Sequence, residues 1–227
     1  MLDNLGLAEG EISLSELLRE PSLGVRRRTA PSDTVLYVAG SPADNLFFIQ
    51  SGQVRQDRLA TDGSCLLLDI AGPGQWLGVE SIGSATYTCQ AMTTTETVAL
   101  VLPAQRLTEI LPRYPQVSLE IIRRLAARLQ TATEEAGGLA FEDCRHRLLR
   151  ALLRFGRSAV ATATHDGVML RMTHEQLAQA VGSARETVTL VLTELRNANM
   201  LRTGRNKLTF NPQALAAALA NHEIQNA

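Results

Sequence analysis

The spacing of apolar residues changes abruptly near Pro115, and this change limits the folds open to the chain. Before it, from Thr34 to about Val101, short runs rich in β-branched and aromatic residues alternate with turn residues, a pattern typical of a β-sandwich or barrel. After it, apolar residues recur at steps of three and four, the period of an α-helix. A length of 227 residues also favours two modest domains over one large one.

Five apolar runs are predicted to form the strands of the first region: residues 34–38, 46–49, 53–55, 66–70 and 96–101. Gly, Asp and Pro residues separate them and supply the backbone angles that turns require. The pair Asp62-Gly63 predicts a tight hairpin. The glycines of residues 72–78 resemble a dinucleotide-binding fingerprint but have the wrong spacing and no following helix, so we interpret this segment as a turn.

A single apolar seam marks the long helix that follows Pro115. It comprises Ile122, Leu125, Leu129, Ala132, Ala136 and Leu139. One alternative is a helix packed on its own domain. We favour pairing with the same helix of a second copy, because a seam this long between two domains has more surface than one small sheet covers. The alanines allow close approach of two helices and leave room beside them for sensing the state of the first domain.

The most informative stretch lies between Thr173 and Asn197, where two short helices are predicted with a glycine between them. Thr173 and Gln176 have the spacing of a capping box, and the apolar face that follows ends at Gly182. Ser183 and Glu186 have the same spacing and predict the start of the second helix. Two helices joined by such a turn form a helix-turn-helix, whose second helix fits the major groove of DNA.

Polar and basic residues in and after this motif are the candidate DNA contacts. They are Thr173, His174, Ser183, Arg185, Glu186, Thr187, Thr189, Arg205 and Lys207. Arginine can donate two hydrogen bonds to guanine, and glutamate can accept one from cytosine. Residues 202–207 form a basic hairpin tip between apolar flanks, as expected of a wing that contacts phosphates. Taken singly, Arg185 can be interpreted as a solvated cap residue and residues 202–207 as an ordinary surface hairpin. The order of helix, turn, helix and hairpin along the chain favours a DNA-binding domain.

Charge is unevenly divided along the chain. Residues 1–140 hold 11 basic and 16 acidic residues, a net charge of −5, whereas residues 141–227 hold 11 basic and 7 acidic residues, a net charge of +4. An acidic front and a basic back are consistent with a sensor joined to a DNA-binding module.

Several classes of protein are not supported by the sequence. It has no Gly-x-Ser-x-Gly, Walker or His-Glu-x-x-His motif, so we predict no enzyme activity. Cys65, Cys89 and Cys144 lie far apart, which predicts thiols rather than a metal site or disulfides. No apolar run approaches the roughly 20 residues of a membrane span, and the first residues do not resemble a secretion signal, so we expect a cytoplasmic protein.

From about Gly40 to Asn211 the chain resembles the catabolite activator and fumarate-nitrate regulator (Crp/Fnr) superfamily of bacterial transcription regulators. The resemblance is closest in residues 128–130, 138–141, 165–167 and 182–188. It implies an α+β protein with an N-terminal β-roll, a long dimerisation helix and a C-terminal winged helix-turn-helix that binds a palindrome of double-stranded DNA. In the activating members a loop contacts RNA polymerase, and residues 159–167 are its expected counterpart here.

The domain boundaries that follow are residues 1–115 for an N-terminal extension and β-roll effector-sensing domain, 116–140 for the dimerisation helix, and 141–227 for the DNA-binding domain. The alternative is a ligand-binding module that acts on a protein partner without contacting DNA. Salt-dependent retention on DNA separates the two, because phosphate contacts weaken steeply with salt.

The resemblance also locates an effector pocket, and here the chain departs from the cyclic-AMP members. The expected pocket residues are Gly78, Val79, Glu80, Ser81, Tyr87, Thr88, Ala132 and Thr133. Tyr87 and Thr88 stand where those members carry an arginine and its Ser or Thr partner on the cyclic phosphate, and Ala132 has lost a hydroxyl. A buried phosphate without its guanidinium is costly, so cyclic AMP is not the expected effector.

The chain also lacks features of other branches of the superfamily. It has no N-terminal cysteine cluster for iron and sulfur, and its four histidines lie outside the β-roll, which argues against haem. We therefore predict no cofactor or metal, and the sequence does not identify an effector. In the second helix, Leu190 stands five residues after Arg185, where family members usually carry a second base-contacting arginine.

Overall fold

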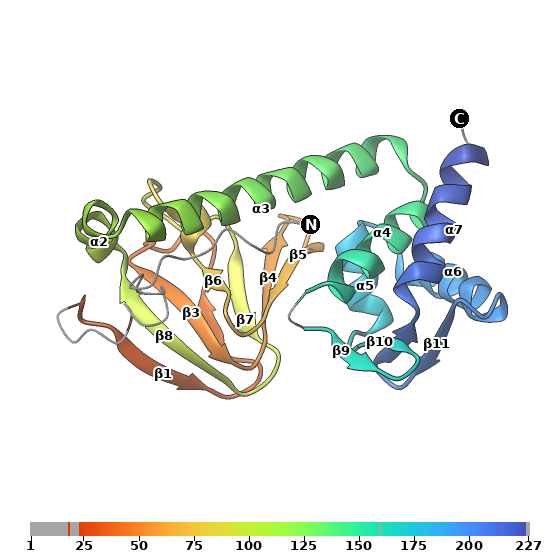
Figure 1. Cartoon of the computed structure of the whole chain (residues 1–227), viewed down its shortest axis with the longest axis horizontal. Helices are drawn as coiled ribbons and strands as arrows, with labels where there is room; N and C mark the ends of the chain where they lie inside the picture. The colour runs from red at the N-terminus through yellow and green to blue at the C-terminus, as the bar shows by residue number, and fades with distance from the viewer. Residues whose placement is uncertain (1–17, 19–22, 159, 226–227) are drawn as a thin grey trace.

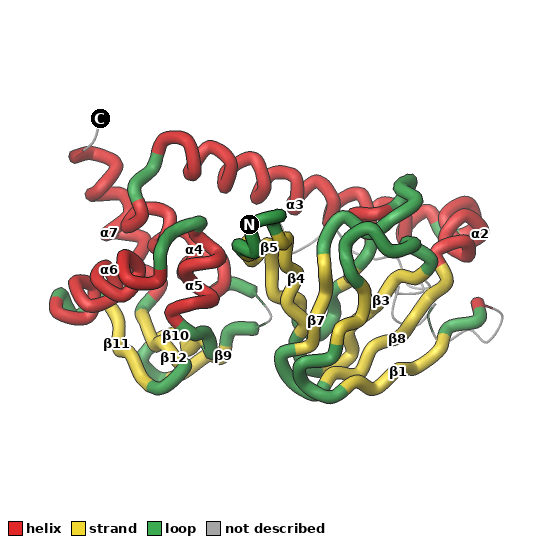
Figure 2. Tube along the Cα trace, turned by 180° about the vertical axis from the view of Figure 1, so that it is seen from behind, coloured by secondary structure: helices red, strands yellow, loops and turns green. Residues whose placement is uncertain are grey.

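The computed structural model describes residue 18, residues 23–158 and residues 160–225. Two compact units are joined by a long helix, α3, that runs along one side of both (Figures 1 and 2). The N-terminal unit is built from strands and the C-terminal unit mainly from helices, as the change of apolar period near Pro115 predicts.

Two four-stranded antiparallel sheets pack face to face in the N-terminal unit and form the β-roll. One has the order β1-β8-β3-β6 and the other β2-β7-β4-β5. The strands are β1 (Arg26–Ala30), β2 (Val35–Tyr37), β3 (Asn45–Ser51), β4 (Val54–Leu59), β5 (Cys65–Ala71), β6 (Trp76–Leu77), β7 (Gln90–Thr93) and β8 (Thr97–Pro103). Side chains that alternate along β3 and β8, such as Phe47, Ile49 and Ala99, fill the space between the sheets.

Some strands differ from the predicted ones. β1 and β7 were not predicted, because three arginines and a mixed polar run hide their β character. β6 lies within the segment that we interpreted as a turn. The predicted hairpin at Asp62-Gly63 is present between β4 and β5, with Gly63 at a φ of 83°.

Short helical turns close the β-roll before the long helix begins. They are η2 (Val79–Ser81), η3 (Ala104–Arg106) and α2 (Leu107–Arg113). The long helix α3 (Pro115–Phe141) has 27 residues and starts with a proline in its first turn, where the missing N–H costs nothing.

The inner face of α3 packs on the β-roll. Ile121 is buried there, and Leu125 packs against the same apolar cluster, which also contains Val79. Leu125 was predicted to lie on the intersubunit seam. The structure corrects this, because Leu125 lies on the face that covers its own domain.

The outer face of α3 carries a regular stripe of six apolar residues and one threonine that no described residue covers. It runs through Leu119, Ile122, Ala126, Leu129, Thr133, Ala136 and Ala140, at strictly alternating steps of three and four, and every one of these residues is exposed. Leu129 is 69% exposed. We call this set the outer stripe. The outer stripe and the predicted seam have Ile122, Leu129 and Ala136 in common. Where the seam has Leu125, Ala132 and Leu139, the stripe has the next residue in each case, so the stripe is rotated about the helix axis relative to the seam.

The C-terminal unit has one core surrounded by four helices and a small sheet. Its elements are α4 (Cys144–Gly156), β9 (Thr162–Thr164), β10 (Gly167–Leu170), α5 (His174–Val181), α6 (Arg185–Asn197), β11 (Leu201–Gly204), β12 (Lys207–Phe210) and α7 (Pro212–Gln225). The sheet has the order β11-β12-β10-β9. Part of the loop expected over residues 159–167 forms β9, which pairs with β10 in an exposed hairpin.

One strand of the β-roll, β5, packs against the C-terminal unit (Figures 1 and 2). Leu67 and Ile70 of β5 are 2% and 4% exposed, and both belong to the apolar core that α4, α5 and α6 build. Polar contacts flank this docking: Arg128 of α3 pairs with Asp69 at 3.0 Å, and Arg154 of α4 pairs with Glu135 of α3. Two side chains of β5 therefore belong to the core of the C-terminal unit, while the rest of the β-roll has clusters of its own.

The end of α3 also contacts the C-terminal unit. Gly182 has a left-handed φ of 58°, which favours glycine, and a methyl group there would lie 3.0 Å from Leu139. Leu139, which was predicted on the seam, therefore contacts the turn between α5 and α6 in its own chain. Arg147 donates to the carbonyl of Glu142 at 2.7 Å and to that of Val181 at 2.9 Å, which links the end of α3 to the end of α5.

Candidate nucleic-acid interface and effector pocket

Helices α5 and α6 form the predicted helix-turn-helix. Thr173 accepts a hydrogen bond from the backbone N–H of Gln176 at 3.1 Å, and the Gln176 side chain accepts one from the Thr173 N–H at 2.8 Å, so the first capping box is confirmed. The second predicted capping box, of Ser183 and Glu186, is wrong. Helix α6 begins at Arg185 with Ala184 as its N-cap, and no side chain caps it. Ser183 lies one residue too early because the Gly182 turn takes it into the connection.

The outer side of α6 presents polar side chains near its first turns. Arg185, Glu186 and Thr187 are exposed, and so is Leu190, at 66%. The opposite side buries Val188 and neighbouring apolar residues in the core of the C-terminal unit. A helix that is held by one apolar face and has Arg and Glu free at its N-terminal end can place both against base edges.

Thr189 has a different position from the one expected. It is half-buried, its hydroxyl donates to the carbonyl of Arg185 at 2.8 Å, and it lies 3.0 Å from Nδ1 of His174. Thr189 and His174 therefore fix α6 against the first turn of α5. Thr173 likewise uses its hydroxyl in the capping box, which leaves its side chain a structural role.

The hairpin of β11 and β12 forms the wing, with Arg205 and Asn206 at its tip. Arg205 and Lys207 are exposed, and Asn206 takes the left-handed φ of 54° that this tight turn requires. Arg202 pairs with Asp166 at 3.2 Å, which links the wing to the turn of the β9–β10 hairpin. Sequence reasoning placed Arg202 in the hairpin but missed this partner.

A polar groove of about 460 Å³ lies between the wing and the helix-turn-helix. Its lining brings together five of the predicted residues: Thr173, His174, Arg185, Arg205 and Lys207. Ser183, Glu186, Thr187 and Thr189 do not line it. Within the described part of the chain, Arg185, Arg205 and Lys207 form no ion pair, so their charges remain available to an anion. Three free cations around a groove beside an exposed helix suit a phosphate backbone.

In the predicted effector pocket of the β-roll, Glu80 is hydrogen-bonded by other side chains of the same domain. The amide of Gln56 donates to Glu80 at 2.7 Å and to the Tyr37 hydroxyl at 3.0 Å, and Tyr37 lies 3.3 Å from the same carboxylate. Cys89 donates to Glu80 as well, at 3.5 Å. We call these four residues the Glu80 network. Glu80, the one acidic residue of the predicted pocket, is thus already hydrogen-bonded from three sides.

Tyr87 completes the packing of this pocket. Its ring stacks on Tyr37 with centroids 3.9 Å apart, and its hydroxyl donates to the carbonyl of Asn45 at 2.6 Å. The backbone of Gly78 lies close to the Tyr87 ring, since a methyl group at Gly78 would be 3.3 Å from it. Gly78 also has a φ of 85°, which favours glycine. Tyr87 is thus buried in the β-roll, at the position where the resemblance puts the arginine of the cyclic-AMP members.

Three residues of the predicted pocket lie outside it. Thr88 is exposed, because it alternates with the buried Tyr87 and Cys89 along an extended segment. Ala132 and Thr133 are exposed on α3, away from the β-roll of their own chain, and Thr133 belongs to the outer stripe. Val79 and Ser81 are buried, although Val79 packs towards α3 in a separate apolar cluster.

Burial alters the acidity of the network. Burial raises the pKa of Cys89 to about 12, and the nearby negative charge of Glu80 adds to this effect. The pKa of Tyr37 is also raised, by burial first and by Glu80 second. Cys89 is thus a protonated, unreactive thiol at neutral pH. Sequence reasoning missed Tyr37, Gln56 and Cys89; the signal for Gln56 was its spacing of two from Val54, which puts an amide on the inner face of β4.

A winged helix-turn-helix with free cations, joined by a long helix to a β-roll, defines a two-domain DNA-binding regulator. Comparisons with known proteins agree. Residues 27–114 match the family described as cyclic nucleotide-binding domain, and residues 146–218 match the Crp-like helix-turn-helix domain. Of the described residues, none forms a helix long and apolar enough to cross a membrane.

Two curated relatives cover most of the chain. A CRP-like cAMP-activated global transcriptional regulator of Mycobacterium tuberculosis is 33% identical over 82% of this chain and 84% of its own length. The cyclic AMP receptor protein of Thermus thermophilus is 29% identical over 86% and 88%. Among solved structures, the c-di-GMP responsive regulator CLP of Xanthomonas campestris has a TM-score of 0.71 and 27% identity over 82% of this chain and 94% of that one.

The chain therefore belongs to the Crp/Fnr family of transcription regulators, and it is a DNA-binding transcription regulator and not an enzyme. The predicted α+β fold is confirmed. The alternative of a regulatory module that does not contact DNA has no support from these relatives.

The exposed positions of α6 and the wing predict different effects on DNA binding. Arg185→Ala should cost about 1–3 kcal/mol on the specific site and relax base preference, because it removes a donor to a base edge. Lys207→Ala should weaken all sequences alike and reduce the salt slope by about one unit. Random-site selection followed by affinity measurement at several salt concentrations checks both. An Arg185→Ala protein that discriminates its site as well as the unaltered protein would contradict this assignment.

Proposed function

We propose that the protein binds a palindromic DNA site as a homodimer formed by pairing of α3 with α3 of a second copy. The outer stripe is the observation that carries this proposal. Helix α3 runs along one edge of the molecule (Figure 1), and the seven residues of the outer stripe are exposed on it at heptad spacing. An apolar stripe of this length is unfavourable in water. Ala126, Ala136 and Ala140 within it allow the two helix backbones to approach closely.

The dimer sets the geometry of the DNA site. Two α6 helices related by a two-fold axis enter successive major grooves on one side of the duplex, so the half-site centres lie about one helical turn, roughly 34 Å, apart. Arg185 and Glu186 read each half-site. Leu190 cannot donate to a base edge, but it can pack on a thymine methyl, so the base at this second position differs from the one that an arginine selects. Because the protein acts on chromosomal DNA, we place it in the cytoplasm.

Leu129→Asp should convert the dimer into monomers, because burying an unpaired carboxylate in the outer stripe is strongly unfavourable. The matched control is Ala127→Asp, which places the same charge on an exposed position of α3 outside the stripe. Sedimentation equilibrium measures the mass of each variant. A Leu129→Asp protein that sediments as a dimer would refute pairing through this face.

We further propose that cyclic AMP is not the effector, although two relatives are described as responding to it. The Glu80 network and the stacked Tyr37 and Tyr87 support this, because a nucleotide would have to break these contacts and would meet a tyrosine in place of a guanidinium. The β-roll then serves either a different effector or a structural role.

Calorimetry should detect no saturable binding of cyclic AMP at micromolar concentrations. The Mycobacterium tuberculosis relative, tested in parallel, is the positive control. DNA binding by the same sample shows that the protein is folded. A saturable micromolar isotherm for this protein would overturn the exclusion.

The exposed β9–β10 hairpin is our proposed contact for RNA polymerase, in the position expected from the family. Residues 162–166 are all exposed, and the hairpin lies on the small sheet away from the core. Replacing Thr164 and His165 by alanine should leave DNA affinity unchanged and alter transcription in a reconstituted system. Unaltered transcription would remove the basis for this contact.

A further inference from the structure

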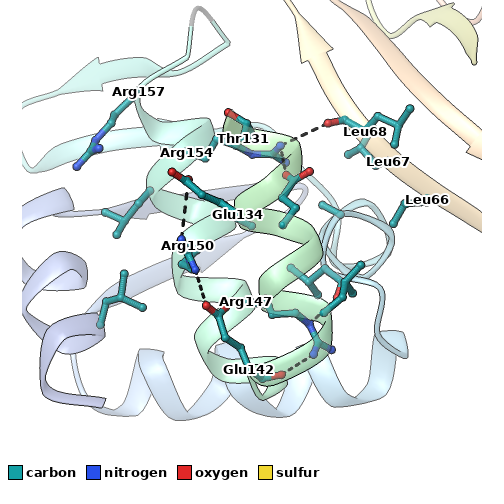
Figure 3. Close-up of a pocket in the computed structure, with 18 of the residues that line it drawn as sticks. Leu66, Leu67, Leu68, Thr131, Glu134, Glu142, Arg147, Arg150, Arg154 and Arg157 are labelled. Carbon is teal, nitrogen blue, oxygen red and sulfur yellow. Dashed lines mark hydrogen bonds and ion pairs between the residues drawn. The ribbon is translucent and has the colours of Figure 1, made fainter. Parts of the chain in front are cut away.

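A cleft of about 510 Å³ lies between the β-roll, the end of α3 and the C-terminal unit (Figure 3). It is separate from the groove beside the wing and from the interior of the β-roll, since it shares no lining residue with the former and contains no member of the Glu80 network. Its volume is in the range of sites for small organic ligands.

One side of the cleft is apolar. Leu66 and Leu68 of β5 line it and remain half-buried, although their neighbour Leu67 is fully packed in the shared core. Leu153 of α4 and Leu219 of α7 lie on the same lining. Such a wall gains free energy when it covers the apolar body of a ligand.

The other side is formed by arginines of α4 and its C-cap: Arg147, Arg150, Arg154 and Arg157. Arg150 pairs with Glu142, and Arg154 pairs with Glu135 (Figure 3 shows Arg150 between Glu134 and Glu142). Arg147 is held by backbone carbonyls. Arg157 is exposed, and within the described residues it forms no ion pair; Figure 3 shows it apart from the glutamates.

Arg154 also has unused hydrogen-bonding capacity. Its Nε and Nη2 atoms are buried and have no acceptor among the described residues, while Nη1 contacts Glu135 and, at 3.4 Å, the carbonyl of Leu68. Buried N–H donors without an acceptor are unfavourable, and an anion that reached them would relieve this cost. Guanidinium groups bind carboxylates, sulfonates and phosphates through paired donors.

We propose that this interdomain cleft binds an amphipathic organic anion, that is, an apolar body carrying one carboxylate, sulfonate or phosphate group. The anionic group pairs with the arginine side of the cleft, where Arg157 is the exposed guanidinium, and the apolar body lies against Leu66, Leu153 and Leu219. Because Leu66 and Leu68 belong to the β-roll and the arginines to the C-terminal unit, a ligand there contacts both units at once. Its affinity therefore depends on how the two units are docked, and the docking depends on the ligand.

The test uses a pair of fluorescent probes that differ in charge. Anilinonaphthalene sulfonate has an aromatic body and a sulfonate, and phenylnaphthylamine has the same aromatic body without it. Titrated into the full-length protein, the sulfonate should saturate at one molecule per chain. The uncharged probe should have an affinity at least about tenfold lower, because it lacks charge-assisted hydrogen bonds.

Two variants locate the site. Arg157→Gln should weaken binding of the sulfonate probe about tenfold, and Leu66→Asp should do so by at least as much, because it places a negative charge on the apolar wall. Arg171→Gln, an exposed arginine of the same unit outside the cleft, is the matched control and should leave the affinity unchanged. Circular dichroism of each variant verifies its fold.

The proposal is overturned if the uncharged probe binds as tightly as the sulfonate. It is equally overturned if both cleft variants bind the sulfonate with the affinity of Arg171→Gln, since the probe would then occupy another apolar surface, such as the outer stripe. Neither readout involves DNA binding or dimerisation, so the outcome is independent of the function proposed above.

Discussion

The docking of β5 into the core of the C-terminal unit is the interaction on which the rest of this structure depends. The side chains of Leu67 and Ile70 in β5 pack into the core of the C-terminal unit. Two nearly fully buried aliphatic side chains contribute about 3–6 kcal/mol of transfer free energy, enough to hold one domain against another. This contact decides the direction in which α6 and the wing face.

The polar contacts around that docking fix the orientation of the elements more than they stabilise the fold. The pair of Arg128 with Asp69 is about one third exposed, and such pairs typically contribute at most about 1 kcal/mol. Their value lies in geometry, because Arg128 connects α3 to β5 while Arg147 connects the end of α3 to the end of α5. These contacts link α3 both to β5 and to the end of α5 in the helix-turn-helix.

The β-roll has the fold of its family, and its interior is occupied by a hydrogen-bonded network of its own side chains. The strands and the η2 turn that surround a ligand in a cyclic nucleotide-binding domain are present, and residues 27–114 match that family. In its interior, however, Glu80 accepts hydrogen bonds from Tyr37, Gln56 and Cys89, and Tyr87 stacks on Tyr37. A fold does not fix a function, so the effector of this chain has to be argued from the side chains of the pocket and not from the architecture.

The sequence by itself determined the features that depend on a few neighbouring residues. The Thr173–Gln176 capping box, the Gly182 turn and the long helix after Pro115 follow from local hydrogen bonds, backbone angles and helical period. Arg185, Arg205 and Lys207 were found in this way, because their motif is short and ordered along the chain. The exposed, unpaired state of these three side chains came from the structure.

Only the tertiary structure decided which of two adjacent apolar stripes on α3 is buried. Leu125 and Ala126 are neighbours, and either can continue a three-four repeat, so periodicity alone cannot choose between them. The β-roll makes the choice by packing on Leu125 and leaving Ala126 on the outer stripe. The same reason explains the Glu80 network, because Tyr37, Gln56 and Glu80 are distant in sequence and only folding brings them into contact.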